Sequence, residues 1–262
     1  MIFKELYEYR EMIFTLVKKD LRGRYKGSIL GFFWTFLNPL LQLVVYTLVF
    51  SVIMRTDYEQ YYLFLFVALV PWMFFSASVQ DGSSCIIREA NLVKKIYFPR
   101  EVLPLATVTT GFVNMLLTFV VVFAVLLFSG RGINPQAMLC LPVVMIVEYI
   151  LSLGFALIVS ACAVYVRDLQ YIIGIIMMAL QYMTPVLYDV SLVENSGVGT
   201  FIKTIFYLNP MTPIINIYRQ ILYFKQVPDL TTLLWAVGVG VVLIVVGEIV
   251  FRKLQRGFAE EF

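Results

Sequence analysis

Histidine is absent from this sequence of 262 residues, and cysteine is scarce. Without imidazole the chain cannot build histidine-ligated metal sites, Ser-His-Asp triads or histidine proton shuttles. The three cysteines, Cys85, Cys140 and Cys162, are odd in number, widely spaced and placed in or beside apolar runs. Neither a disulfide framework nor a cysteine metal site is expected from such a pattern. The sequence therefore predicts no metal centre.

The motifs for nucleotide binding and hydrolysis are missing as well. The chain contains no G-x-x-x-x-G-K-[ST], no G-x-S-x-G and no H-E-x-x-H. It therefore cannot bind ATP through a P-loop or cleave esters and peptides by those routes. No convergent set of acids and bases on a loop supports a membrane-embedded transferase. If ATP drives a transport reaction here, another subunit must bind it, and we expect no cofactor on this chain.

Charged residues are also few, and hydrophobic residues make up most of the sequence. Charged residues make up 14% and hydrophobic residues 61% of the sequence, and the mean hydropathy is +0.87. This composition is far from that of a water-soluble domain and indicates an integral membrane protein. The first apolar run is too long for a signal-peptide core and follows a charged segment, so no cleavable leader is expected. The net charge of +3 gives no reason to expect nucleic acid as a partner.

Six apolar runs are long enough to cross a bilayer core of about 30 Å as helices. The predicted fold is therefore all-α and polytopic. The predicted spans are Phe33 to Met54, Tyr61 to Val79, Val102 to Phe128, Ala137 to Val166, Leu169 to Tyr188, and Thr231 to Phe251.

One further apolar stretch, Phe201 to Phe224, makes a poor span. It is interrupted by Asn209, Pro210 and Pro213 and carries two cations. Such a stretch is typical of a re-entrant pair of short helices. It lies within the segment 189–229, which follows the fifth predicted span.

The distribution of basic residues predicts the orientation. With six spans, both termini lie on one side, and that side carries 15 of the 20 lysines and arginines. The positive-inside rule then places both termini in the cytoplasm. The segment 189–229 becomes external, and residues 252–262 form a cytoplasmic tail.

Residues 1–31 contain an amphipathic stretch that precedes the first span. Apolar and basic residues alternate at helical spacing, which predicts a helix lying at the cytoplasmic headgroup level. Such a helix is either a simple anchor or a moving, gating element. The apolar face has Met12, Ile13, Leu16, Val17, Leu21 and Tyr25, and the basic face has Lys18, Lys19, Arg22, Arg24 and Lys26.

Two other features carry alternatives. The cytoplasmic loop from Arg88 to Arg100 mixes charge with apolar residues, so it is either a short helix that docks a soluble partner or a loop bound to headgroups. Glu148 is the acidic residue nearest the middle of a span. A buried carboxylate is costly in a membrane, so Glu148 either makes an interhelical hydrogen bond or serves a proton relay.

Aromatic residues reach 16%, and several lie within the predicted spans rather than at their ends. Sugar rings stack on aromatic faces, so a channel lined by such residues could pass a glycan. The alternative is ordinary packing or contact with lipid.

The order of several motifs resembles the membrane subunit of ABC-2 type exporters, in the branch that moves lipid-linked polysaccharides such as O-antigen, teichoic acid or capsular polysaccharide. The matching motifs are K-D-L-R-G-R-Y-K-G-S-I-L-G-F-F-W-T-F-L-N-P-L, V-P-W-M-F-F-S, E-A-N-L-V-K-K-I-Y-F-P, V-R-D-L, T-P-V-L-Y and N-P-M-T-P, and they span nearly the whole chain.

This resemblance implies a bacterial plasma-membrane (inner-membrane) homodimer that works with two copies of a P-loop ATPase, which binds ATP and Mg²⁺. A continuous channel would lie between the two membrane subunits. The implied ATPase-coupling residues are Lys19, Arg22, Arg24, Arg88, Glu89, Asn91, Lys94, Lys95, Arg167 and Asp168. The implied glycan-facing aromatic residues are Phe33, Trp34, Phe36, Trp72, Phe75 and Tyr182. The implied external gate contains Phe206, Tyr207, Asn209, Pro210, Pro213 and Arg219.

Two alternative functions follow from the same residues. An ABC-2 exporter of a drug or a small lipid keeps the architecture, but such proteins often carry a large external domain between the first two spans, where this chain has only Arg55 to Gln60. A proton-coupled secondary transporter would depend on Glu148 and on no ATPase.

Overall fold

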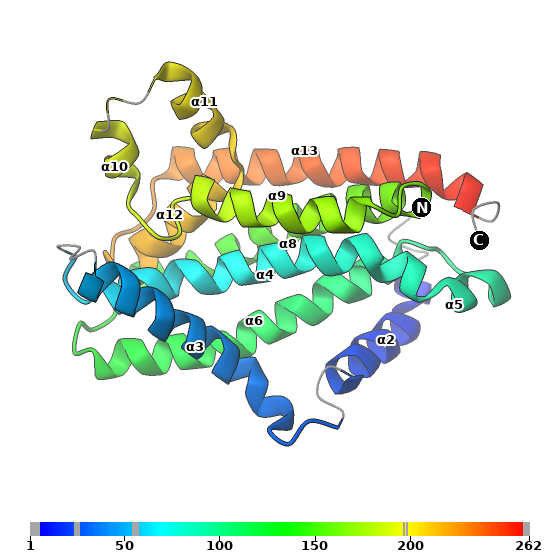
Figure 1. Cartoon of the computed structure of the whole chain (residues 1–262), viewed down its shortest axis with the longest axis horizontal. Coiled ribbons are helices and arrows are strands. Elements are labelled where there is room, and N and C mark those ends of the chain that lie inside the picture. Colours follow the sequence, from blue (N-terminus) through cyan, green and yellow to red (C-terminus); the bar gives the residue numbers. More distant parts are fainter. Residues whose placement is uncertain (1–5, 24–26, 54–57, 196, 198, 259–262) are drawn as a thin grey trace.

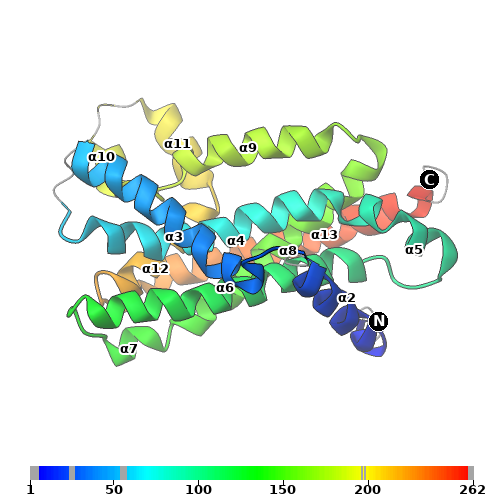
Figure 2. The ribbon, with the colours of Figure 1, turned by 60° about the horizontal axis from the view of Figure 1, so that its bottom comes forward.

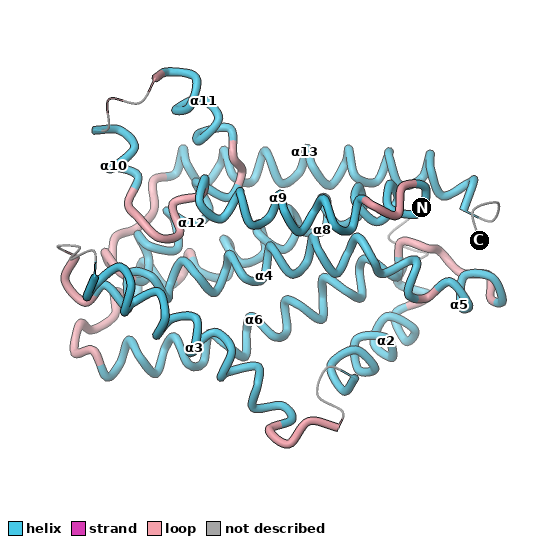
Figure 3. Tube along the Cα trace, viewed as in Figure 1, coloured by secondary structure: helices cyan, strands magenta, loops and turns pink. Residues whose placement is uncertain are grey.

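A computed structural model describes residues 6–23, 27–53, 58–195, 197 and 199–258. The described residues form helices and loops and contain no strand, which confirms that the fold is all-α. The long helices lie side by side as a bundle, and short helices occupy its two ends (Figures 1 and 3). In chain order the helices are α2 (Arg10–Gly23), η1 (Gly31–Phe33), α3 (Trp34–Thr47), the π-helix η2 (Leu48–Ile53), α4 (Tyr61–Arg88), α5 (Ala90–Lys95), α6 (Val102–Phe128), α7 (Pro135–Met138), α8 (Leu141–Tyr165), α9 (Leu169–Met183), α10 (Val190–Asn195), α11 (Thr200–Leu208), α12 (Met211–Leu222), α13 (Leu230–Leu254) and η3 (Gln255–Gly257).

Within the described residues, five helical stretches are long and apolar enough to cross a membrane. They are Gly31–Ser51, Tyr61–Arg88, Val102–Phe128, Pro135–Tyr165 and Leu230–Gly257. They correspond to the predicted spans one to four and six. Met54, the predicted end of the first span, lies outside the described residues.

The fifth predicted span, Leu169 to Tyr188, coincides with α9, whose helix has 15 residues. The helix ends at Met183, and Thr184 adopts an extended conformation before Pro185, because proline disfavours the helical conformation in the residue that precedes it. α9 alone is thus shorter than the roughly 20 residues that a span needs. The count of six spans remains a prediction.

The second span is longer than predicted, because α4 continues from Val79 to Arg88. Its 28 residues are buried along most of their length, and α3, α6, α8, α9 and α12 all contact it. A helix that is apolar on every side is expected in such a central position. α4 therefore forms the axis on which the other helices are placed.

Small residues allow the closest helix contacts. A Cβ atom added to Gly247 of α13 would lie 2.6 Å from the carbonyl oxygen of Gly154 on α8. One added to Gly82 of α4 would lie 2.9 Å from the Cβ of Ala156 on α8. Lipid gives helices no hydrophobic reason to associate, so close backbone packing of this kind holds them together.

The two ends of the bundle differ. α2, α5, the turn between α8 and α9, and the end of α13 gather at one end, whereas α10, α11 and α12 gather at the other (Figures 1 and 2). The predicted re-entrant stretch is two helices, α11 and α12, which are separated at Asn209 and Pro210. Whether these helices enter the membrane remains a prediction.

Candidate functional site: a coupling end, an apolar face and a gate

The predicted amphipathic helix and the predicted cytoplasmic loop touch each other. Lys19 of α2 forms an ion pair with Glu89, the residue before α5, with 2.5 Å between Nζ and Oε1. Leu16 and Val17 of α2 belong to the same apolar cluster as Val93 of α5. The loop thus contains a short helix, as one of its two interpretations predicted, and the residue before that helix is paired with α2.

The elements that carry the other predicted coupling residues gather at the same end of the bundle (Figure 1). Arg22 is exposed on α2, Arg24 lies outside the described residues, and Arg88 is exposed at the end of α4. α5 turns Val93 inward. The exposed residues at this end also include Asn91, Lys94 and Lys95 of α5 and Arg167 and Asp168 in the turn between α8 and α9.

A cleft of about 740 Å³ is lined by residues of α2, α3, α4 and α6. Its lining includes Lys19, Trp34, Asn38, Gln80 and Arg88. Trp34 and Asn38 also line a smaller pocket of about 180 Å³ that lies deeper between α3, α4 and α6. The cleft extends from the charged end of the molecule toward the apolar part of the bundle. The sequence alone did not predict it.

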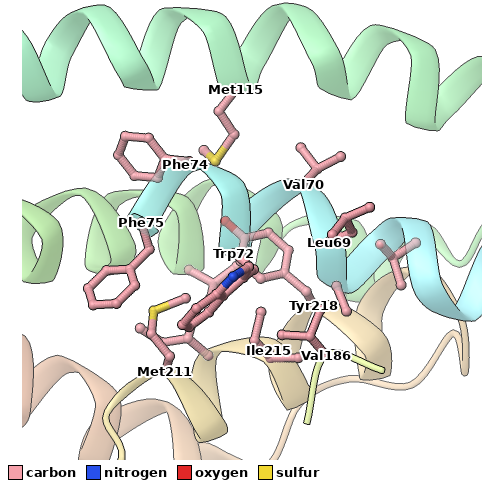
Figure 4. Packing of buried hydrophobic residues seen from close by; sticks show 14 of the residues in the cluster. Leu69, Val70, Trp72, Phe74, Phe75, Met115, Val186, Met211, Ile215 and Tyr218 are labelled. Carbon is pink, nitrogen blue, oxygen red and sulfur yellow. The ribbon is translucent and has the colours of Figure 1, made fainter. Parts of the chain in front are cut away.

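The six predicted channel aromatics divide into two groups. Phe33, Trp34 and Tyr182 are 61%, 40% and 60% exposed, and Phe36 is half-buried against Phe33. Trp72 and Phe75 of α4 are buried. Figure 4 shows the Trp72 ring beside Met211 and Ile215 of α12. In this conformation the two α4 rings form part of the chain's own core.

The exposed aromatics belong to a larger apolar surface on α3 and α9. Gln181 of α9 donates a 3.1 Å hydrogen bond to the Tyr46 hydroxyl of α3, which connects the two helices. Exposed apolar side chains on the helices of a membrane protein contact lipid or another protein. The exposed residues include Leu41, Val44 and Val45 of α3, Leu48 of η2, and Tyr171, Ile175, Met178 and Tyr182 of α9.

At the other end of the bundle, Arg219 of α12 is buried and clamps the segment after α9. Its guanidinium donates hydrogen bonds of 2.7 Å and 2.6 Å to the carbonyl oxygens of Tyr188 and Val186. It also lies 3.7 Å from the centre of the Phe64 ring of α4. A buried charge needs such hydrogen bonds to offset its lost hydration. Arg219 therefore fixes α12 to the segment that leads from α9 into α10.

Asn209 makes a second connection to the same segment. Its Nδ2 donates to the Thr184 hydroxyl at 2.7 Å, and its Oδ1 accepts from the backbone N–H of Met211 at 3.0 Å. Pro210 follows as the residue before α12, and Pro213 lies in its first turn. The prolines suit a helix start, where no intrahelical donor is needed.

The two remaining predicted gate residues lie on α11. Phe206 is buried and stacks with Tyr188. Tyr207 donates a 2.7 Å hydrogen bond to the Glu194 carboxylate, and this bond raises the pKa of the Tyr207 hydroxyl. The structure thus brings Phe206, Asn209 and Arg219 together around residues 184–188.

Glu148 of α8 is fully buried and accepts a 2.6 Å hydrogen bond from the Tyr218 hydroxyl of α12. The predicted interhelical hydrogen bond is therefore present. Among the described residues, the second carboxylate oxygen of Glu148 has no hydrogen-bond partner. Sequence reasoning identified Glu148 but not Tyr218, because no spacing in the sequence relates two helices that are far apart in the chain.

Comparison with known proteins gives a consistent result. Residues 11–223 match the family described as ABC-2 type transporter. The chain is 35% identical over 259 residues to the O-antigen export system permease protein RfbA of Myxococcus xanthus, which covers 99% of this chain and 98% of that protein. It is 30% identical over 250 residues to a protein of the same name from Klebsiella pneumoniae, which covers 95% of this chain and 94% of the relative.

Proposed function

Because the chain belongs to the ABC-2 type transporter family, we propose that it is the permease subunit of an exporter of lipid-linked polysaccharide, of the O-antigen or teichoic-acid type. The observation that carries the proposal is the likeness to O-antigen export permeases over almost the whole chain. The short connection between the first two spans, residues 54–60, also favours the polysaccharide branch over exporters with a large external domain.

Two copies of the chain would assemble in the bacterial inner membrane with two copies of a P-loop ATPase. The exposed apolar surface of α3 and α9 supports a contact between the copies, since α9 packs on its own chain along one side only. The channel would run along this contact, with Phe33, Trp34 and Tyr182 as the exposed rings available to sugar faces. The subunit itself would be non-catalytic.

The coupling end would receive the motion of the ATPase. Because the Lys19–Glu89 pair binds α2 to α5, a push on α5 would reach α2 and the first span that follows it. The polar cleft between α2 and α4 would widen or narrow with that motion. We assign substrate loading to this end and substrate release to the Arg219 end, with both termini in the cytoplasm.

The first experiment is mild detergent extraction of the tagged protein, followed by mass spectrometry of the proteins that co-purify. Recovery of a P-loop ATPase in about equal amount would support the exporter. The purified pair would then be tested for ATP-dependent transfer of the native lipid-linked glycan across vesicle membranes. Absence of an ATPase under several mild detergents would contradict the proposal.

Two controls distinguish the alternative functions. If the vesicles export a small lipid or a drug but not the glycan, the chain belongs to the other functional branch of the family. If transport persists without the ATPase and is lost in Glu148→Gln, the chain is a proton-coupled transporter. The hydrogen bond from Tyr218 occupies one oxygen of Glu148, which favours a structural role for this carboxylate.

A further inference from the structure

A groove of about 790 Å³ opens between α11, α12 and the first turns of α13. α11 stands off the end of the bundle beside the start of α13 (Figure 1). A volume of this size is within the range of ligand sites, and such sites often lie between helices. The lining includes Lys203, Thr204, Tyr207, Asn216, Thr232 and Trp235.

The surface beside the groove is apolar and belongs in part to α13, a helix that would contact lipid. α13 is long and apolar enough to cross the membrane, and Leu230 and Leu234 in its first turns are 64% and 60% exposed. On α11, Phe206 is buried, but Phe201 and Leu208 are exposed. A helix with an exposed apolar face next to a span is expected to lie in the headgroup layer.

The aromatic residues of the groove agree with this depth. Tyr207 and Trp235 are both about half exposed, with 46% and 45% of their surface accessible. Tyrosine and tryptophan are enriched where the hydrocarbon meets the headgroups, because each ring has an apolar body and a polar tip. The groove therefore lies where a phospholipid headgroup would meet the protein.

The groove has a lysine in its lining and a carboxylate beside it. Lys203 lines it and donates to the carbonyl oxygen of Glu194 at 2.8 Å, which leaves further ammonium protons for another acceptor. Asp229 does not line the groove, but it accepts hydrogen bonds from the hydroxyls of Thr231 and Thr232, which do. The bond from Thr231 holds the pKa of Asp229 below its usual range, so this carboxylate is ionised at neutral pH.

A second carboxylate, that of Glu194, accepts the hydrogen bond from Tyr207. Lys203 is the cation of the groove lining, and the two carboxylates lie next to the lining, hydrogen-bonded to its hydroxyl groups. An anionic headgroup would be repelled by the carboxylates, and a choline group has no N–H to donate to them. A headgroup that carries both a phosphate and a primary ammonium complements a lysine that lies near a carboxylate.

We propose that this groove binds a zwitterionic phospholipid of the phosphatidylethanolamine type, with its phosphate at Lys203, its ammonium at Asp229 and its acyl chains along Leu230 and Leu234. α11 then lies in the external headgroup layer and holds α12 at a fixed depth. The inference depends on α13 as a membrane-crossing helix and not on the cargo of the exporter.

The test uses the fluorescence of Trp235 in a variant in which Trp34 and Trp72 are replaced by phenylalanine. The protein is placed in phosphatidylcholine nanodiscs that contain a rising fraction of phosphatidylethanolamine brominated on its acyl chains. We expect quenching to saturate at a low fraction, well below that needed with brominated phosphatidylcholine or phosphatidylglycerol. Lys203→Ala should weaken this binding about tenfold, as expected for loss of a charge-assisted hydrogen bond.

Asp229→Asn provides the matched comparison. It should remove the preference for phosphatidylethanolamine over phosphatidylcholine while keeping the contact of Lys203 with phosphate. Lys253→Ala, at the opposite end of α13, should leave the quenching curve unchanged. The substitution of Trp72 changes the core, so a second measurement uses protein that keeps all three tryptophans. Native mass spectrometry of the lipid bound to this protein compares the same lipids and the same variants.

Equal quenching by the three brominated lipids, or unchanged selectivity in both groove variants, would overturn the proposal. So would displacement of the lipid by polysaccharide released from the native cells, since the groove would then be a glycan site. No ATPase and no cargo enter the lipid measurement. Failure of the export assay would therefore contradict the proposed function and leave the lipid site standing.

Discussion

Lys19 and Glu89 lie 70 residues apart in the chain and form a 2.5 Å ion pair that joins α2 to the start of α5. The lysine side chain is 57% exposed, whereas the glutamate is 19% exposed. Two elements that the sequence assigns to the cytoplasmic surface therefore form one unit. Motion imposed on either element is expected to reach the other.

Breaking this pair should uncouple export rather than unfold the protein. We expect Lys19→Ala and Glu89→Ala each to lower glycan export while ATP hydrolysis by the partner subunit continues. An exposed ion pair contributes about 1 kcal/mol or less to stability, so the thermal unfolding temperature should hardly change. The measurement is glycan transferred per ATP hydrolysed in vesicles.

Charge reversal and a control on the same helix complete this test. The double variant Lys19→Glu with Glu89→Lys should recover part of the lost coupling. Arg10→Ala removes a weaker pair with Glu11 on α2, whose nearest atoms are 3.9 Å apart and whose side chains are largely exposed. Equal loss of coupling in Arg10→Ala would show that the Lys19–Glu89 contact has no special role.

Arg219→Ala should destabilise the protein strongly. The substitution leaves the carbonyl groups of Val186 and Tyr188 without their donors and removes the contact with Phe64. Losing one partner of a buried charged network costs about 3–5 kcal/mol. Arg252→Ala, which breaks a helical i,i+4 pair with Glu248 on α13, should cost about 0.5 kcal/mol. Fluorescence-detected size-exclusion chromatography after heating measures the melting temperature of each variant. Equal melting temperatures for Arg219→Ala and Arg252→Ala would contradict a stabilising role for the hydrogen bonds of Arg219.

The Glu148–Tyr218 hydrogen bond can be tested by a double-mutant cycle. Glu148→Gln keeps an oxygen acceptor for Tyr218 and should be nearly neutral. Glu148→Leu leaves the Tyr218 hydroxyl unpaired and should cost about 1–2 kcal/mol. Adding Tyr218→Phe should restore most of that loss, since both partners are then apolar. Additive losses in the double variant would mean that the two side chains do not interact.

The contact between α8 and α13 predicts a sharp difference between two glycines of one helix. Gly247→Leu would place its Cβ 2.6 Å from the carbonyl oxygen of Gly154, so the helices must separate. At Gly238 a Cβ would meet no described atom within 4 Å. Gly247→Leu should therefore abolish the monodisperse folded protein in detergent, whereas Gly238→Leu should elute like the parent chain. Similar elution of both variants would contradict this packing.

The sequence was sufficient to predict which segments are helical and roughly where most of them begin and end. The span Val102 to Phe128 coincides with α6, and the first and last spans differ from the structure by a few residues. Length and composition are enough because a chain in lipid must satisfy its backbone hydrogen bonds within each helix. The prediction was weakest at α9, where Pro185 ends the helix before the apolar run ends.

The faces of the helices were decided by the tertiary structure alone. Trp72 and Tyr182 both lie in apolar helices, yet Trp72 packs in the core and Tyr182 is exposed. In a water-soluble protein polar residues mark the outer face of a helix, but in a membrane both faces are apolar, so sequence periodicity carries little information. The partners of Glu148 and Arg219 were undetermined for a related reason, because contacts between helices distant in the chain depend on how the bundle packs. By itself, then, the sequence determined that the chain is helical, membrane-spanning and charged at one end, because each helix forms its backbone hydrogen bonds within itself. Packing decided which side chains meet, because contacts between side chains depend on how distant helices are arranged.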